Sequence, residues 1–248
     1  MRIRYARLPR LESLLGAIYP PQCALCDALV VQAGGLCGPC WAGTPFLTGL
    51  VCDLCGTPLP GDDPGHPAHC DDCLAIARGW DRGRAALAYR DGGRRFVLAL
   101  KHGDRLDLVP LGAVWLRRAA GPLLRPGQVA VPVPAHWRRL VGRRYNQAAE
   151  LARALARSTG MRAEMRALVR IRRTRVQEGM SRDERFANMC DAIRPHPRFG
   201  DRLRGRDVLL VDDVITSGAT LAAAAEAARA AGAAHVAVAA LARAVKAT

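Results

Sequence analysis

The spacing of its cysteines constrains this chain more than any other feature. Eight of the nine cysteines form four C-x-x-C pairs within the first third of the chain, and only Cys190 stands alone. The pairs are Cys23/Cys26, Cys37/Cys40, Cys52/Cys55 and Cys70/Cys73. Each pair can present two thiolates to one ion, and two pairs complete the tetrahedron that zinc prefers. The spacing therefore predicts two structural Zn²⁺ sites of the zinc-ribbon kind, with these eight cysteines as ligands and no open coordination position.

The spacing leaves the grouping of the ligands open. The pairs could join sequentially or interleave, and sequential grouping is favoured because each half repeats the same plan of knuckle, loop and knuckle. His66 and His69 flank Cys70 and could replace a thiolate, although the cysteines already fill both sites. An iron–sulfur or redox role is a further alternative. Cys190 is expected to be a small core residue.

Disulfides are the remaining alternative, and they need an oxidising compartment. The start of the chain is basic, but its apolar part is short, is interrupted by Glu12 and lacks an A-x-A cleavage site before Pro20. Residues 1–19 are better interpreted as a short amphipathic helix, because their leucines and isoleucine recur at helical spacing. We therefore expect a cytoplasmic protein whose thiols stay reduced.

Composition changes near residue 80. Residues 20–79 are rich in Cys, Gly, Pro and Asp, whereas apolar runs alternate with helical patterns from residue 80 to 248. Buried strands are predicted at 129–134, 207–214 and 235–241, with weaker or shorter ones at 84–90 and 168–171, and helices at 106–120, 146–158 and 219–231. This alternation predicts an α/β domain with a mostly parallel sheet covered on both faces. No stretch approaches the roughly 20 apolar residues of a membrane-spanning helix.

The chain is strongly basic. Lys and Arg together number 37 against 22 Asp and Glu, which gives a net charge of +15, and only Lys101 and Lys246 are lysines. Guanidinium groups suit phosphate, so the excess is compatible with contact to nucleic acid, although a coding bias would also produce it. Aromatic residues make up only 5% of the chain, which counts against a strong base-stacking platform.

The segment 208–232 carries the most chemical information. A run of four apolar residues ends in Asp212-Asp213, and a loop of small and hydroxylated residues leads into an Ala-rich helix that Gly232 can end. Small residues let the backbone wrap closely around an anion at the helix N-terminus. Adjacent carboxylates suit sugar hydroxyls or a divalent cation. The pattern favours a ribose 5-phosphate over an ordinary strand-to-helix turn, and it is neither a Walker loop nor a G-x-G-x-x-G motif.

The sequence VLLVDDVITSGAT closely resembles the motif that binds 5-phosphoribosyl 1-pyrophosphate (PRPP) in type I phosphoribosyltransferases. The resemblance implies that Asp212 and Asp213 contact the ribose hydroxyls and that Mg²⁺ accompanies PRPP. It further implies that the loop binds the 5-phosphate. The loop residues are Thr216, Ser217, Gly218, Ala219 and Thr220.

With the cysteine pairs, three further segments resemble the ComF family, also called ComFC or GntX-like, from about Cys23 to Arg243. They are LKHGDR (100–105), VPVPAHWRRLVGRRYNQA (131–148) and RTRVQEGMSRDERFAN (173–188). Two positions depart from the usual pattern: Arg144 stands where the family has Gly, and Ser217 where it has a second Thr. The resemblance implies a double zinc ribbon at 20–79 followed by a type I phosphoribosyltransferase-like domain at 80–248, and a link with DNA uptake or natural transformation.

The same resemblance supplies further candidates. Some are expected to contact pyrophosphate or to lie in the flexible loop that closes over the ligand, namely Lys101, Arg138, Arg143, Arg144, Thr174, Gln177 and Arg185. The alternatives are a solvated basic face for the arginines, a solvent-facing lysine, and hydrogen bonds within the loop for the others. No residue is singled out as catalytic.

Three functions follow as hypotheses. The first is a ComF-like protein that binds PRPP or a related ligand, contacts single-stranded DNA, and works with DNA-uptake or recombination proteins. The second is an active phosphoribosyltransferase of nucleotide metabolism. The third is a non-catalytic adaptor whose zinc ribbons bind a protein partner, since a fold does not by itself establish a function.

Overall fold

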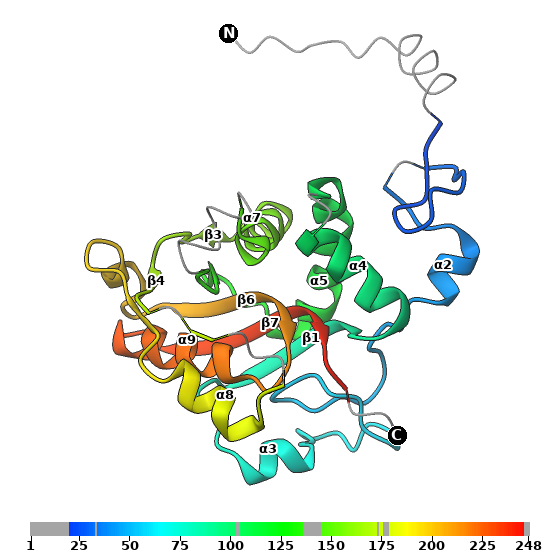
Figure 1. Ribbon diagram of the computed structural model, residues 1–248. Helices are drawn as coiled ribbons and strands as arrows, with labels where there is room; N and C mark the ends of the chain where they lie inside the picture. Colours follow the sequence, from blue (N-terminus) through cyan, green and yellow to red (C-terminus); the bar gives the residue numbers. More distant parts are fainter. Residues whose placement is uncertain are drawn as a thin grey trace, which may run out of the picture.

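The computed structural model describes residues 20–32, 34–102, 105–135, 145–172, 174–175 and 179–245 (Figure 1). The helix expected within residues 1–19 lies outside this part of the chain. Among the described residues, no helix is both long enough and apolar enough to cross a bilayer.

The centre of the molecule is a parallel sheet of five strands in the order β1-β7-β6-β2-β3. The strands are β1 (Arg82–Ala88), β7 (His235–Arg243), β6 (Asp207–Ile215), β2 (Val129–Pro132) and β3 (Arg162–Ala163). The four predicted segments at 84–90, 129–134, 207–214 and 235–241 all form strands of this sheet. Short Val- and Ala-rich runs suit it, because a parallel strand covered on both faces has no polar side.

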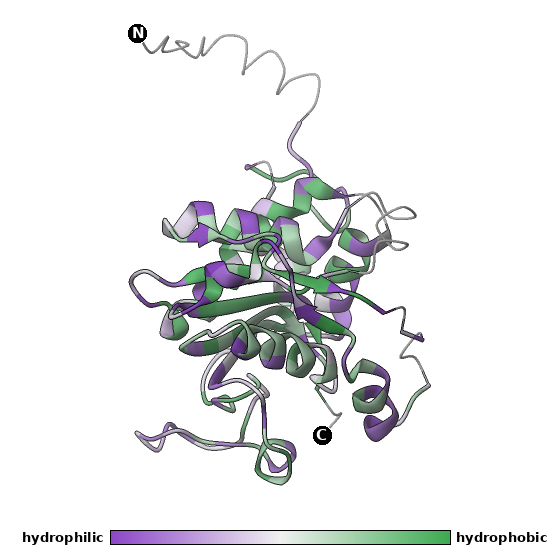
Figure 2. Ribbon diagram, turned by 90° about the vertical axis from the view of Figure 1, so that its left-hand side faces the viewer, coloured by the Kyte–Doolittle hydropathy of each residue, from purple (hydrophilic) through white to green (hydrophobic). Residues whose placement is uncertain are grey.

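Helices cover both faces of the sheet (Figure 1). One face carries α4 (Asp91–His102), α5 (Val109–Ala120) and α7 (Gln147–Thr159), and the other carries α8 (Arg182–Met189) and α9 (Ala219–Ala230). Side chains of β6 alternate between these layers: Leu209 packs in the α5–α7 core, whereas Val208 and Leu210 pack in the α9 core. Figure 2 shows the largely apolar strands of the sheet between helices that contain both hydrophilic and hydrophobic residues. The mostly parallel α/β fold is confirmed.

Local sequence explains where several helices begin and end. Asn146 caps α7, since its side chain accepts a hydrogen bond from the Ala148 amide at 3.1 Å and donates one to the Val133 carbonyl at 3.0 Å. Ser181 and Glu184 form a reciprocal capping box at the start of α8. Cys190 follows that helix and is exposed, so its predicted core position is wrong. Met189, one residue earlier, faces the core instead.

Shorter elements complete the domain. The antiparallel pair of β4 (Leu168–Arg170) and β5 (Ile193–Pro195) packs on α9, and α8 lies in the connection between the two strands. Three 3-10 turns are η1 (Leu106–Leu108), η2 (Gly121–Leu123) and η3 (Gly200–Leu203).

The cysteine-rich region forms two lobes, one around α2 (Gly38–Ala42) and one around α3 (Asp71–Ala75) (Figure 1). The segment after the first lobe packs on α5, where the Phe46 ring lies 5.3 Å from the Trp115 ring in an edge-to-face arrangement. The second lobe lies along β1. A Cβ at Gly83 of that strand would collide with the Leu54 carbonyl, so the close approach requires glycine.

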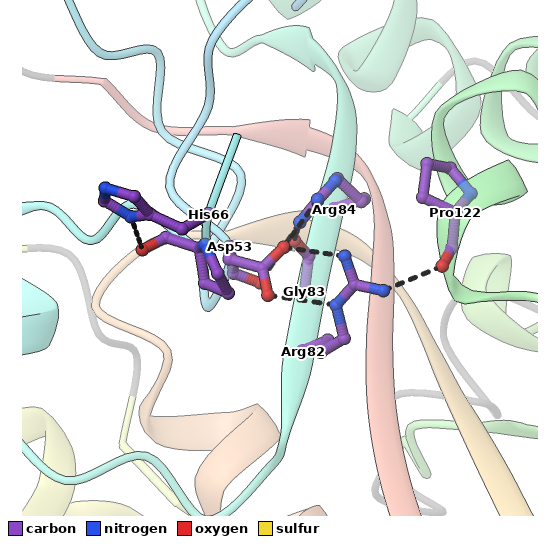
Figure 3. Close-up of polar contacts among 7 residues, drawn as sticks. Asp53, His66, Arg82, Gly83, Arg84 and Pro122 are labelled. Atoms are coloured by element: carbon purple, nitrogen blue, oxygen red, sulfur yellow. Dashed lines mark hydrogen bonds and ion pairs between the residues drawn. The ribbon is translucent and has the colours of Figure 1, made fainter. Parts of the chain in front are cut away.

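An acidic residue fixes the second lobe to the sheet. Asp53 lies between two cysteines of this lobe and accepts hydrogen bonds from Arg82 and Arg84 of β1, at 2.6 to 2.9 Å (Figure 3). Hydrogen bonds from Arg82, and to a lesser degree from Arg84, lower the pKa of Asp53 to about 2 although burial opposes the shift. The carboxylate therefore stays ionised and joins the lobe to the first strand of the sheet.

Candidate functional site

The eight paired cysteines gather into two clusters. One holds Cys23, Cys26, Cys37 and Cys40, and the other holds Cys52, Cys55, Cys70 and Cys73. The sulfur atoms of each cluster lie within 4.8 Å of one another, and the grouping is the sequential one. None of the nine cysteines, all of which the structure describes, forms a disulfide. His66 and His69 belong to neither cluster.

The geometry of both clusters fits zinc. A tetrahedral site with zinc–sulfur bonds of about 2.3 Å places its sulfurs about 3.8 Å apart. The Cys26 and Cys37 sulfurs lie 3.5 Å apart in the first cluster, and the Cys55 and Cys70 sulfurs 3.7 Å apart in the second. Backbone N–H groups of Cys37 and Leu25 donate to the Cys23 sulfur, which suits a thiolate. Both sites are four-cysteine sites of the structural kind.

The acidic pair lies at the carboxyl end of β6. Asp213 points toward α4, where Lys101 Nζ lies 3.0 Å from its Oδ2. Because successive side chains of a strand point to opposite faces of the sheet, Asp212 lies on the face opposite to Asp213. Its Oδ1 accepts a hydrogen bond from the Asp213 amide at 2.9 Å. Burial and then the charge of Asp213 raise the pKa of Asp212 to about 8, against a smaller opposing effect of Lys101. The pair therefore holds a proton near neutral pH.

The loop between β6 and α9 has backbone N–H groups that no neighbouring described residue engages. Ser217 Oγ accepts a hydrogen bond from the Ala219 amide at 3.3 Å, and Gly218 has a left-handed φ of 87° at the start of the helix. Among the described residues, none accepts a hydrogen bond from the backbone N–H groups of Thr216, Ser217 and Gly218. Three consecutive donors at the N-terminus of a helix can bind an anion.

Two arginines hold the carbonyl side of the same loop. Arg243 Nη1 donates to the Ile215 carbonyl at 3.2 Å and also to the Thr216 carbonyl. Arg78 Nη1 donates to the Ser217 carbonyl at 2.9 Å. The sequence motifs identified neither arginine, because these contacts join positions that are 27 to 139 residues apart.

A cleft adjoins the loop. Thr216 and Ser217 line it on the side of the loop, and Arg182, Asp183 and Arg185 line it from α8. Its other walls include Asp72 of the second lobe, Tyr89 after β1 and Arg243 at the end of β7. Arg182 Nη2 lies 2.5 Å from Asp72 Oδ1, so α8 and α3 are joined across the cleft. Arg185, predicted as a flexible-loop contact, thus lies in the same cleft as the loop.

The remaining residues that were predicted to contact the ligand do not line this cleft or lie outside the described part of the chain. Thr174 is buried, and its hydroxyl accepts a hydrogen bond from Arg170. Asn188 holds the backbone of Arg175 through hydrogen bonds to both its amide and its carbonyl, which favours the loop-supporting alternative for that segment. Four further candidates lie outside the described residues, namely Arg138, Arg143, Arg144 and Gln177.

Two family models match the chain. Residues 14–74 match a double zinc ribbon domain, and residues 147–248 match a phosphoribosyl transferase domain. Among solved structures, a glutamine PRPP amidotransferase from B. subtilis overlaps 57% of this chain and 30% of its own, at 19% identity and a TM-score of 0.37. The chain therefore spans less than a third of that protein's length.

Curated relatives match over most of the chain. The DNA utilization protein YhgH of Salmonella typhi is 30% identical over 214 residues, which cover 82% of this chain and 88% of that protein. Competence protein F of Haemophilus influenzae is 28% identical over 198 residues, which cover 78% of this chain and 83% of that protein. With its double zinc ribbon and phosphoribosyltransferase domain, this chain belongs to the ComF family.

Proposed function

We propose that this protein binds PRPP or a related 5-phosphoribosyl ligand at the carboxyl end of β6, as part of DNA utilization. The observation that carries the proposal is the row of three N–H groups, at Thr216, Ser217 and Gly218, that follows the acidic pair and has no acceptor among the described residues. A phosphate monoester accepts several hydrogen bonds at once and gains from the positive end of α9. The hydroxyl of Thr220, the second residue of α9, would add a donor to the 5-phosphate.

The acidic pair suits the sugar. Asp212 and Asp213 lie on the strand that leads into the loop, so a ribose whose 5-phosphate sits in the loop would have its hydroxyls near these carboxylates. Their oxygens also suit Mg²⁺, which would neutralise pyrophosphate when bound. Lys101 already balances Asp213 in the absence of a ligand, and it is available to interact with a phosphate that approaches the pair.

Calorimetric titration with PRPP and Mg²⁺ tests this site. We expect Asp212→Asn combined with Asp213→Asn to weaken binding about tenfold or more, because the pair loses the negative charge that strengthens its hydrogen bonds to the ribose hydroxyls. Asp207→Asn is the matched control, since it removes a carboxylate from the opposite end of the same strand. Equal affinity in wild type and in the double variant would overturn the assignment.

Contact with single-stranded DNA is the second part of the proposal. The names of the relatives, DNA utilization protein and competence protein, support a role in DNA metabolism, and the net charge of +15 supports binding to a polyanion. We expect affinity for a fluorescent oligonucleotide to fall steeply as salt rises. No binding at low salt would refute this part. The free thiols also support a cytoplasmic location, where thiols stay reduced.

Phosphoribosyl transfer is a second candidate function, and the cleft beside the loop favours it. Thr216 and Ser217 line this cleft together with Arg185, so an acceptor could approach a bound ribose from there. Release of pyrophosphate from PRPP with one member of a panel of bases and amines would establish transfer. Binding of PRPP without turnover across the panel would leave the protein as a ligand-binding member of the family.

A further inference from the structure

Arg78 connects the second cysteine cluster to the loop between β6 and α9. It lies between α3 and β1, where its Nε donates to the Cys73 sulfur at 3.3 Å and its Nη1 donates to the Ser217 carbonyl at 2.9 Å. Its guanidinium also lies 5.4 Å from the centre of the Trp80 ring. A Cβ on Gly218 would approach Arg78 Nη1 to 2.9 Å, so the loop packs directly on this side chain.

Arg243 makes a second connection to the same cluster. From the end of β7, its Nε donates to Thr57 Oγ1 at 3.1 Å, and that hydroxyl oxygen lies 3.1 Å from the Cys55 sulfur, to which it can donate when the sulfur is a thiolate. Its Nη1 donates to the carbonyls of Ile215 and Thr216. Each arginine therefore touches the cluster, directly or through one hydroxyl, at one end and the loop at the other.

Among the described residues, neither arginine forms an ion pair with an acidic side chain. Arg243 is buried, with 5% of its surface exposed. A buried charge without a counter-charge is costly. Four thiolates around one Zn²⁺ carry a net negative charge, so the loaded cluster would supply the compensation that no carboxylate provides.

The held carbonyls determine where the loop's N–H groups point. In a trans peptide, the carbonyl of one residue and the N–H of the next point in opposite directions, and the described residues contain no cis peptide. The arginines donate to the carbonyls of residues 215, 216 and 217 from the side of the cysteine cluster, and the Ala244 amide also donates to the first of them, at 2.8 Å. The N–H groups of the next residues in turn, 216, 217 and 218, therefore point away from it. These are the three donors for which the described part of the chain offers no acceptor.

We propose that Arg78 and Arg243 are positioning residues that couple zinc in the second cluster to phosphate binding by the loop. The zinc thiolates fix the two guanidinium groups, the guanidinium groups fix three peptide units, and the peptide units present their N–H groups to the ligand. This inference rests on the proposed ligand site. Because coupling between two sites is reciprocal, bound phosphate must in turn stabilise zinc in this cluster.

The first test compares ligand affinity in variants of Arg78, which is only partly buried and less risky for folding than Arg243. Lysine cannot bridge two acceptors as the planar guanidinium does, so we expect both Arg78→Lys and Arg78→Gln to bind ribose 5-phosphate about tenfold more weakly in calorimetry. Arg229→Gln is the matched control. Arg229 also donates to the segment between α3 and β1, at the Gly79 carbonyl, but it does so from the far end of α9. It should bind like wild type.

The second test measures zinc directly. A mercurial reagent releases thiolate-bound zinc, and a chelating dye reports the rate. In wild type, we expect saturating ribose 5-phosphate to slow the release of one of two zinc ions per chain and to leave the other unchanged. In Arg78→Gln, which should still carry two zinc ions, the ligand should protect neither.

The outcomes separate this inference from the proposed function. If wild type binds neither ribose 5-phosphate nor PRPP, the proposed function fails and the coupling fails with it. If wild type binds the ligand but Arg78→Lys and Arg78→Gln bind equally well, only the coupling is refuted. Ligand-independent release of both zinc ions in a wild-type protein that binds the ligand refutes it as well.

Discussion

Lys101 Nζ lies 3.0 Å from Asp213 Oδ2, so the lysine of α4 and the acidic pair of β6 form one charged group. This position is compatible with the predicted contact to pyrophosphate, since a ribose beside the pair would carry its pyrophosphate nearby. We expect Lys101→Met to weaken PRPP binding about tenfold, as a charge-assisted contact of this kind is worth about 1.5 kcal/mol. Ribose 5-phosphate, which lacks pyrophosphate, should lose less than about threefold by the same measure. A comparable loss for both ligands in calorimetry would mean that Lys101 acts only by balancing Asp213.

Asp212 makes stability depend on pH in an unusual direction. Its pKa is raised from an ordinary 3.8 to about 8, first by burial, so the folded state holds a proton that the unfolded chain releases. The resulting stabilisation is fully present below pH 4 or so, and it is lost as pH rises toward about 8. Asp212→Asn keeps the acceptor for the Asp213 amide but cannot ionise.

We therefore expect Asp212→Asn to gain stability relative to wild type as pH rises from 5 to 8, by about 3 kcal/mol in the free energy of unfolding. Thermal unfolding at both pH values checks this. Asp207→Asn, at the other end of β6, should show no such difference. A gain for Asp212→Asn that is equal at both pH values would contradict the raised pKa.

Asp53 shows the opposite dependence. Its pKa is lowered to about 2 by the hydrogen bonds from Arg82 and Arg84, so its contribution is present above the ordinary value of 3.8 and is lost as pH falls toward 2. We expect Asp53→Asn to cost about 2–4 kcal/mol at pH 7, because it breaks a largely buried pair, and to cost less at pH 3. Urea unfolding monitored at both pH values tests this. The exposed Asp62→Asn of the same lobe is the control, and an unchanged denaturation midpoint in Asp53→Asn at pH 7 would refute the role in docking.

The longer strands of the sheet and the motif after β6 could be predicted because the local sequence determines them. Continuous apolar runs allowed β2, β6 and β7 to be located, and the loop after Asp213 stands out by residue type. The helix α4 was not predicted, and its first residues, Asp91-Gly92-Gly93, are typical of a turn. The structure explains these glycines: a Cβ at Gly92 would come within 2.6 Å of the Gly43 carbonyl, and one at Gly93 would collide with the Ala88 carbonyl.

The arginines that hold the loop could not be predicted, and the reason is physical. Arg78 and Arg243 resemble every other arginine of this basic chain until folding brings them to the loop carbonyls. The prediction for Cys190 is wrong for a related reason. The apolar character of a cysteine does not determine whether its side chain is buried or exposed at the end of a helix. Positions that depend on tertiary contacts between distant segments leave no local pattern.

Gly218 offers the sharpest test of the loop's shape. Its φ of 87° is left-handed, and an added Cβ would lie 2.9 Å from Arg78 Nη1 and 3.0 Å from Trp80 Cη2. We expect Gly218→Ala to cost about 1–2 kcal/mol of stability from the backbone conformation. It should also weaken ribose 5-phosphate binding about tenfold, because the added methyl displaces Arg78 and turns the held peptide units.

The variant Gly205→Ala separates the effect of backbone strain from the effect of displacing Arg78. Gly205 also has a left-handed φ, of 66°, but an added Cβ there would have no neighbour within 4 Å. The two variants should therefore lose similar stability in thermal unfolding, while only Gly218→Ala should lose ligand affinity in calorimetry. If Gly218→Ala binds ribose 5-phosphate as tightly as Gly205→Ala does, the loop tolerates displacement of Arg78, and its N–H groups do not depend on the arginine for their orientation.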